Sequence, residues 1–256
     1  MPDKSAIEWT DATWNPVTGC TKISPGCAHC YAETITLRFK RGGPFLPGQT
    51  TITLHPDRLD APGKWRSSRL VFVNSMSDLF HEEVPFEFIG QVFDRMASYS
   101  QHTYQVLTKR PDRMMEYVRW SGNKRWPDHV WAGVSVENQY WADRRVPLLR
   151  EVPSAIRFLS CEPLLKPLEL DMGGISWVIV GGESGNKARK MEESWAIDIR
   201  DQCQRAGVDF FFKQWGGRTP KAGGRELAGR HFDAMPRWRV SRALRDNESR
   251  LVNAAG

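Results

Sequence analysis

Short apolar runs rich in β-branched residues recur along the chain, and longer amphipathic stretches separate them. The runs predict strands at 51–54, 70–73, 104–107, 130–136, 156–159, 177–180 and 209–212, with a first strand near 7–14. Strands that alternate with helices pair in parallel through right-handed crossovers. We therefore predict an α/β fold in which about seven or eight parallel strands form a complete or partial (β/α) barrel.

The stretches between the strands carry apolar side chains at helical spacing. Pro85 opens one such stretch, in which Phe86, Ile89, Phe93 and Met96 share one face. The same spacing relates Trp141 to Arg145 and Leu149, and Trp195 to Ile199 and Cys203. Each pattern predicts a helix that packs on the sheet.

Length and composition favour one large domain. The chain has 256 residues, of which 40% are hydrophobic, and single (β/α) barrels are often of this size. We predict a barrel over residues 1–216 and a basic C-terminal extension over 217–256, partly packed on the barrel, with a small glycine-turned hairpin at 221–232. The sequence lacks a long apolar run and an apolar N-terminal signal region, which predicts a cytoplasmic protein with no membrane partner.

The net charge of +6 permits attraction to nucleic acid or another polyanion, although many basic proteins bind neither. The charge is densest between Arg218 and Arg250, where nine lysines and arginines face four acidic residues. A solvated C-terminus explains this run better than a nucleic-acid clamp does, because aromatic residues do not interleave with the charges.

Three of the five cysteines, Cys20, Cys27 and Cys30, lie within residues 18–33. A cubane iron–sulfur cluster uses four ligands, so three thiolates leave one iron open to a molecule other than protein. Turn-forming residues between the cysteines allow the backbone to wrap around such a cluster. Cys161 follows an apolar strand and Cys203 lies on an apolar helical face, so we expect both to be buried and neither to bind metal.

A zinc site and a disulfide framework are the two alternatives to an iron–sulfur cluster. A structural zinc site normally has four ligands, and His29 or His81 could complete it, so zinc stays open. A disulfide framework is less favoured, because an odd number of cysteines and the absence of a secretory signal indicate a reducing compartment. The cysteine spacing alone does not decide between iron–sulfur and zinc.

Polar residues follow nearly every predicted strand. The carboxyl ends of parallel strands meet at one edge of a sheet, where α/β proteins build their sites. Glycines there permit close approach of a ligand, carboxylates can accept hydrogen bonds from an amine or a ribose, and cations can hold a carboxylate or phosphate. A mutual ion-pair network in the barrel mouth is the alternative. The residues concerned are Ser75, Asp78, Lys109, Arg110, Ser135, Glu137, Glu162, Gly181, Gly182, Glu183 and Lys213.

A cysteine triad in a loop near the first strand of a parallel barrel resembles the radical S-adenosylmethionine (SAM) superfamily. Six and then two residues separate these cysteines, where the usual motif has three and then two, and Tyr31 is the aromatic residue beside the third. Other segments more specifically resemble an uncharacterised phage-associated family with the same Cys-x6-Cys-x2-Cys spacing, over most of residues 5–236. These segments are NSMSDLF (74–80), LTKRP (107–111), GVSVEN (133–138), LSCEPLL (159–165), WVIVGGESG (177–185) and FFKQWG (211–216).

The resemblance implies an enzyme in which Cys20, Cys27 and Cys30 hold a [4Fe-4S] cluster whose open iron chelates SAM. An external flavodoxin- or ferredoxin-like donor would reduce the cluster, and cleavage of SAM would yield a 5′-deoxyadenosyl radical that abstracts hydrogen from a substrate. The resemblance also implies a polyanionic or nucleotide-derived substrate, as in repair or modification of nucleic acid. A non-catalytic, zinc-stabilised protein that binds nucleic acid or a partner is the alternative function.

By the same resemblance, the strand-end residues divide into two groups. The glycine-glycine-glutamate signature of the superfamily usually follows an early strand, whereas residues 181–183 follow a late one. Binding of substrate in place of SAM is therefore the alternative role for these three residues. The residues expected to bind SAM are Tyr31, Ser75, Ser135, Glu137, Gly181, Gly182 and Glu183. Those expected to bind substrate are Asp78, Lys109, Arg110, Glu162 and Lys213.

Overall fold

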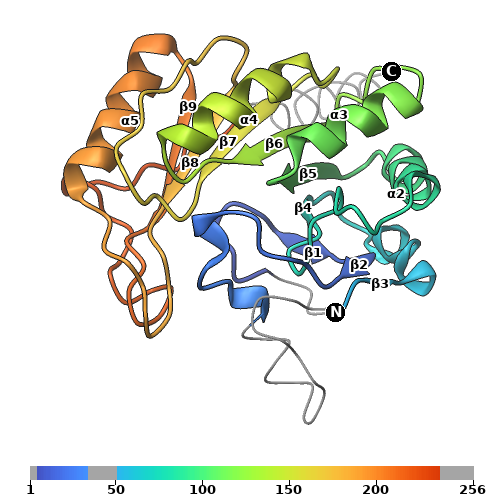
Figure 1. Ribbon diagram of the computed structural model, residues 1–256, viewed down its shortest axis with the longest axis horizontal. Helices are drawn as coiled ribbons and strands as arrows, with labels where there is room; N and C mark the ends of the chain where they lie inside the picture. Colours follow the sequence, from blue (N-terminus) through green and yellow to red (C-terminus); the bar gives the residue numbers. More distant parts are fainter. Residues whose placement is uncertain (1–4, 34–50, 237–256) are drawn as a thin grey trace, which may run out of the picture.

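A computed structural model describes residues 5–33 and 51–236 of the chain. Seven strands form one parallel sheet, and Figure 1 shows the sheet curling like part of a barrel, with β1 and β9 at its edges. The predicted α/β fold with a partial (β/α) barrel is therefore confirmed. In sheet order the strands are β1 (Ala12–Trp14), β4 (Leu70–Val73), β5 (Thr103–Thr108), β6 (Val130–Ser135), β7 (Arg157–Cys161), β8 (Trp177–Gly181) and β9 (Asp209–Gln214).

The expectation that residues 51–54 form a barrel strand is wrong. Instead, β3 (Thr53–Leu54) pairs antiparallel with β2 (Val17–Thr18) in a separate small sheet. Ile52 and Leu54 pack against the core, while the alternate threonines of this segment are exposed. This one-sided burial suits a peripheral strand, whereas the strands of the large sheet are buried on both faces.

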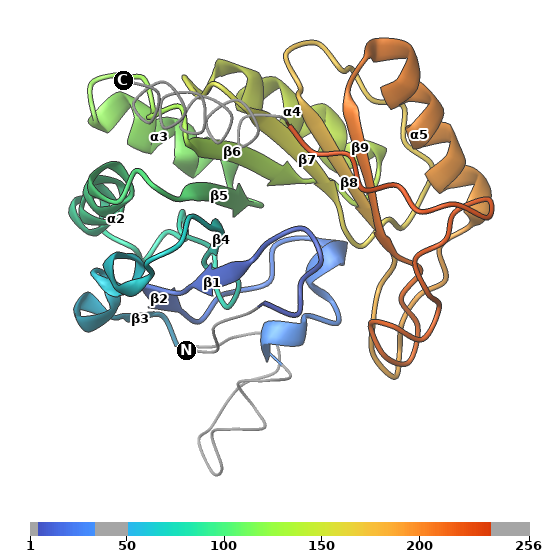
Figure 2. The ribbon, with the colours of Figure 1, turned by 180° about the vertical axis from the view of Figure 1, so that it is seen from behind.

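In the described part of the chain, helices α2 to α5 cover one face of the sheet, as the two opposite views in Figures 1 and 2 show. They are α2 (Phe86–Ser98), α3 (Pro111–Trp120), α4 (Gln139–Glu151) and α5 (Glu193–Ala206). The helices predicted from apolar spacing correspond to α2, α4 and α5 and are confirmed. No helix in the described part of the chain is both long enough and apolar enough to cross a membrane.

Alternation along the strands separates two apolar clusters. Val71 and Val73 of β4 face the helices, whereas Leu70 and Phe72 face the concave side. On that concave side, Trp9, Trp131, Trp177, Phe158 and Phe211 fill the space that the curled sheet encloses. Gly133 of β6 makes room there, because a Cβ atom at this position would come within 2.4 Å of the Phe158 ring.

Residues 217–236 return to the sheet and cover the outer edge of β9. The amide of Phe212 donates to the Phe232 carbonyl at 2.9 Å, and the Trp177 indole Nε1 donates to the Ala234 carbonyl at 2.9 Å. Within the hairpin expected at 221–232, the structure has a tight turn in which the Leu227 amide and the Arg230 carbonyl are 2.8 Å apart. Residues 237–256 of the predicted basic extension lie outside the described residues.

Candidate functional site

Residues 18–33, here called the cysteine loop, lie at the carboxyl edge of the sheet. The loop leaves β2, its Gly19 amide donates to the Met76 carbonyl beyond β4 at 3.3 Å, and Pro25–Cys27 form one 3-10 turn. Gly19 has φ of 92°, and a Cβ atom there would come within 2.1 Å of the Thr51 carbonyl oxygen, so only glycine fits. The predicted turns are thus present, and they hold three half-buried cysteines in one short segment.

The end of β5 fastens the first part of the loop. The guanidinium of Arg110 donates to the Thr21 carbonyl at 3.0 Å and contacts the Cys20 sulfur at 3.6 Å. Asp78 lies 3.3 Å from the same guanidinium and also accepts hydrogen bonds from the Thr108 hydroxyl at 2.7 Å and the Lys109 amide at 3.0 Å. The sequence analysis assigned Arg110 and Asp78 to substrate. In the structure Arg110 contacts the cysteine loop at Cys20 and Thr21, and Asp78 holds the Arg110 side chain in place.

The end of β6 fastens the middle of the loop through a buried ion pair. Glu137 accepts a hydrogen bond from the Gly26 amide at 3.1 Å with one carboxylate oxygen, and from Arg145 of α4 at 2.9 Å with the other. Both charged side chains are almost completely buried, and Arg145 stacks 4.1 Å from the Trp141 ring centre. Burial lowers the pKa of Arg145, and the Glu137 carboxylate opposes that change. Nearby, the Lys109 ammonium donates to the Ser135 hydroxyl at 3.2 Å.

The end of β8 fastens the last part of the loop. Glu183 accepts hydrogen bonds from the His29 ring at 2.9 Å and from the Arg189 Nε at 2.8 Å. Arg189 also donates to the Pro25 carbonyl at 2.9 Å. Burial alone would raise the pKa of Glu183, but the donors of Arg189 and His29 outweigh it and lower that pKa to about 2. The carboxylate is therefore ionised near neutral pH.

Glu162 and Lys213 pair with each other at the mouth of the half-barrel, with their charged atoms 2.8 Å apart. The Trp9 indole donates to the second Glu162 oxygen at 3.3 Å. Gly181 leaves room for this carboxylate, since a Cβ atom would come within 2.7 Å of it. At Gly182, a Cβ atom would come within 1.9 Å of the Trp215 carbonyl oxygen. The ion pair corresponds to the network that the sequence left open as an alternative to ligand binding.

Tyr31 and Ser75, two residues assigned to SAM, lie side by side at the end of β4. The exposed Tyr31 ring donates its hydroxyl to the Ser75 carbonyl. The Ser75 hydroxyl in turn donates to the Asn15 side chain at 3.2 Å, and the Met76 amide donates to the same oxygen at 2.9 Å. The segment that follows the third cysteine is thereby joined to the loop after β4.

The charges around the cysteines differ from one thiol to the next. Burial and the Asp78 carboxylate raise the pKa of Cys20 to about 11. Burial also opposes ionisation of Cys27, but the charge of Lys109 together with hydrogen bonds from Ile23 and Ser24 outweighs burial and lowers the pKa of that thiol. Thiolates clustered in one loop suit iron–sulfur ligation. Within residues 5–33 and 51–236 no three acidic, cysteine or histidine side chains converge on a single metal position. The ligands of a multi-iron cluster do not need to meet at one point.

The two histidines considered as zinc ligands bind other groups. His29 pairs with Glu183, and the His81 ring lies 2.8 Å from the Thr21 hydroxyl. Sequence reasoning did not assign site roles to Arg145 and Arg189, although both hold the cysteine loop. Arg145 carried a usable signal, because a charged residue on the apolar face of a helix indicates a buried ionic partner.

Fold and site together define an α/β half-barrel protein that presents three cysteines in a loop at the carboxyl edge of its sheet. The chain belongs to the family described as "Protein of unknown function (DUF5131)", whose model matches residues 4–236. No curated protein matches the sequence. Among solved structures, a cysteine-to-serine mutant of spore photoproduct lyase is similar with a TM-score of 0.54 and 12% sequence identity, over 83% of this chain and 79% of that chain. This likeness shows a shared fold.

Proposed function

We propose that the protein is a radical SAM enzyme that holds a [4Fe-4S] cluster through Cys20, Cys27 and Cys30. The observation that carries this proposal is the cysteine loop, which residues from three strand ends fasten over the carboxyl edge of a parallel half-barrel. The fold likeness to spore photoproduct lyase, a radical SAM enzyme, supports it. When bound, the cluster and SAM supply one-electron cleavage and hydrogen abstraction.

The protein's own contribution is to hold the thiols in place. Arg110, Glu137 and Glu183 each bond a different part of the cysteine loop, so its backbone is positioned before any cofactor binds. Lys109 favours the thiolate of Cys27, which is the form that binds metal. Substituting any one fastening residue would loosen the loop without removing a metal ligand.

SAM and substrate would meet in the mouth that these strand ends surround. Tyr31, Ser75 and Ser135 remain our proposed SAM-binding residues, with the backbone of 181–182 beside them. Glu137 and Glu183 would affect SAM binding indirectly, because they hold the cysteine loop in position. Lys109 and Lys213 carry the proposal of a polyanionic or nucleotide-derived substrate, which the net charge of +6 supports. An external flavodoxin- or ferredoxin-like protein would donate the electron.

Anaerobic reconstitution tests the proposal. Wild-type protein is expected to take up about four iron atoms per chain, turn brown, and release 5′-deoxyadenosine from SAM after reduction. Cys27→Ala is expected to abolish both iron uptake and SAM cleavage, whereas the matched control Cys203→Ala retains them because that thiol lies on the buried face of α5, outside the cysteine loop. Uptake of one zinc per chain with no iron would instead establish the structural zinc interpretation.

A further inference from the structure

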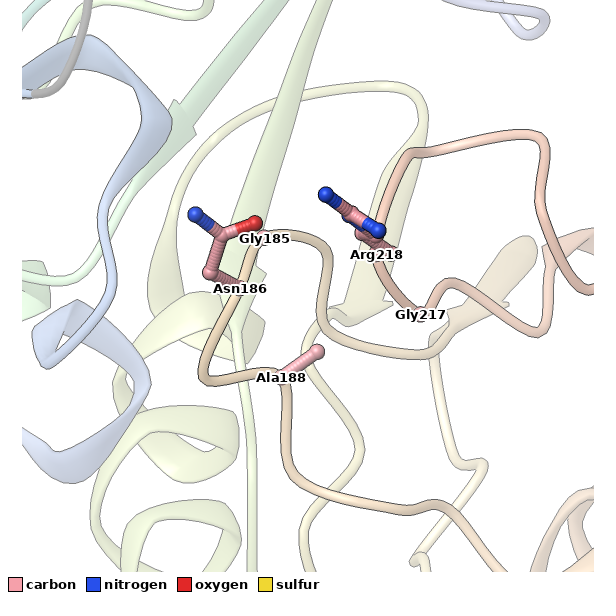
Figure 3. Close-up of a pocket in the computed structure, with 5 residues that line it drawn as sticks. All are labelled: Gly185, Asn186, Ala188, Gly217 and Arg218. Carbon is pink, nitrogen blue, oxygen red and sulfur yellow. The ribbon is translucent and has the colours of Figure 1, made fainter.

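A hollow of about 410 Å³ lies between the segments that follow β8 and β9. Its lining consists of Gly185, Asn186, Ala188, Gly217 and Arg218, and we call it the glycine-loop pocket (Figure 3). None of these residues has a part in the fastening of the cysteine loop. The pocket is open to solvent, so a group attached to a larger molecule can enter it.

Backbone hydrogen bonds join the two walls of the pocket. The Gly185 amide donates to the Gly217 carbonyl at 2.8 Å, and the Gly217 amide donates to the Glu183 carbonyl at 2.9 Å. Gly185 has φ of 126° and Gly217 has φ of 108°, a region that favours glycine. At Gly216, a Cβ atom would come within 2.1 Å of the Glu183 carbonyl oxygen. The glycines therefore permit close pairing of the two segments, and this pairing fixes the shape of the pocket.

Two polar side chains without partners among the described residues line this pocket. Figure 3 shows the Arg218 guanidinium across the hollow from Asn186, whose amide oxygen lies on the side toward Arg218 and whose amide nitrogen points away from it. Both side chains are exposed, and within the described residues neither forms a hydrogen bond or an ion pair. Lys187 lies next to them and is likewise exposed and unpaired among these residues. The neighbouring carboxylate of Glu183 is already neutralised by Arg189.

The pocket adjoins the cysteine loop. Its wall at 185–188 is flanked by Glu183, which bonds His29 at 2.9 Å, and by Arg189, which bonds the Pro25 carbonyl at 2.9 Å. A group held by Asn186 and Arg218 therefore lies beside the segment that carries Cys27 and Cys30. The rest of a molecule anchored there can extend over the mouth of the half-barrel.

We propose that the glycine-loop pocket binds a phosphate group of the substrate, which deepens the proposed function because it assigns a place to the anionic part of that substrate. The Arg218 guanidinium matches the oxygens of a phosphate in charge and in hydrogen-bonding capacity, and rotation of the exposed Asn186 amide brings its NH2 group to the same side. The phosphate belongs either to a free nucleotide or to the backbone of a nucleic acid. Arg218 is the residue that contributes the charge.

Fluorescence anisotropy with the full chain and a labelled single-stranded DNA of about 20 nucleotides tests the proposal. Arg218→Glu is expected to weaken binding about tenfold and to make its dependence on salt shallower, with Arg218→Gln intermediate. The matched control is Arg205→Glu, which makes the same charge change at an exposed position in the last turn of α5. We expect the control to bind within about twofold of wild type.

Competition distinguishes the sources of the phosphate. Displacement of the DNA by adenosine 5′-monophosphate assigns the pocket to a free nucleotide, and displacement by unlabelled DNA alone assigns it to a nucleic-acid backbone. The proposal is overturned if wild type binds neither probe, or if Arg218→Glu behaves like Arg205→Glu. Iron uptake is measured separately on Arg218→Glu, where it should be unchanged. Failure of wild type to bind iron would refute the proposed function while leaving the binding result interpretable.

Discussion

The five cysteines occupy two different chemical environments. Cys20, Cys27 and Cys30 are half-buried in a loop, whereas Cys161 and Cys203 are completely buried between the sheet and the helices. Burial raises the pKa of Cys203 to about 12 and raises that of Cys161 well above its ordinary value. Neither buried thiol ionises near neutral pH, so both behave as small apolar side chains.

Thiol labelling of the native metal-free protein should separate these two groups. With iodoacetamide near pH 8, we expect modification of Cys27 and Cys30, slower modification of Cys20 because its pKa is raised, and protection of Cys161 and Cys203, because alkylation needs an accessible thiolate. Peptide mass spectrometry before and after unfolding in urea measures the difference. Labelling of Cys203 in the native protein as fast as that of Cys30 would contradict the buried environment.

At the residue scale, the sequence predicted which cysteines cluster and which are buried, because clustering and apolar neighbours are local properties. The partners of the strand-end charges could not be predicted in the same way. Glu137 pairs with Arg145, and Glu183 with Arg189, through side-chain orientations that depend on the completed sheet. The sequence predicted a mutual ion-pair network only in general terms as an alternative to ligand binding, and the pairing of Glu162 with Lys213 is one form of it.

The buried pair between Glu137 and Arg145 links helix α4 to the cysteine loop. Arg145→Leu should lower the free energy of unfolding by about 3–5 kcal/mol, because it leaves a buried carboxylate without a counter-ion. Urea denaturation measures this loss, and limited proteolysis of residues 18–33 measures the loosening of the loop. The control Arg144→Leu removes an exposed cation that stacks on Tyr140 and should cost about 1 kcal/mol or less.

A double variant tests whether charge is the cause. Replacing both Glu137 and Arg145 with leucine removes the unpaired carboxylate and should recover part of the stability that Arg145→Leu loses. Equal destabilisation by Arg145→Leu and Arg144→Leu would show that the pair contributes little.

At the element scale, periodicity predicted α2, α4 and α5 because each has one buried face. The strands of the large sheet were predicted from short continuous apolar runs, which arise because both faces of these strands are buried. Residues 51–54 were misassigned, since a four-residue alternating run has the composition of a strand wherever it pairs. Pairing partners depend on long-range contacts, which a local pattern does not contain.

At the scale of the whole molecule, the half-barrel has an outer edge that the chain itself covers. Within residues 217–236, Asp233 forms an antiparallel bridge with Phe211 of β9, and Met235 packs against the concave aromatic cluster. A chain ending at Gly216 should therefore aggregate or melt well below the full chain, because the edge of β9 and the ring of Trp177 become exposed. Size-exclusion chromatography and thermal circular dichroism measure this, and a monomeric fragment with an unchanged Tm would contradict it.

Charge is also distributed unevenly over the molecule. A second hollow, of about 900 Å³, lies between α4, residues 167–172 and α5, and its lining includes Glu169, Asp171, Asp198 and Asp201. Arg205 also lines this hollow, and Asp171 and Asp201 pair with Arg150 and Arg200, so its remaining charge is weakly negative and disfavours a polyanion. Arg218, by contrast, lines the glycine-loop pocket and forms no ion pair within the described residues. Such an arrangement would orient an approaching polyanion toward the carboxyl edge of the sheet.

The residues that fasten the cysteine loop come late in the chain. Cys20 precedes Arg110 by 90 residues, Gly26 precedes Glu137 by 111, and His29 precedes Glu183 by 154. At ribosomal speeds the last of these arrives roughly 8 to 30 s after the loop has been made. During that interval the strand-end residues that hold the cysteine loop have not yet been made, so the nascent thiols are exposed to oxidation. A metal that needs the fastened loop would therefore bind only after residue 183 has been made, and the thiols would have to stay reduced until then.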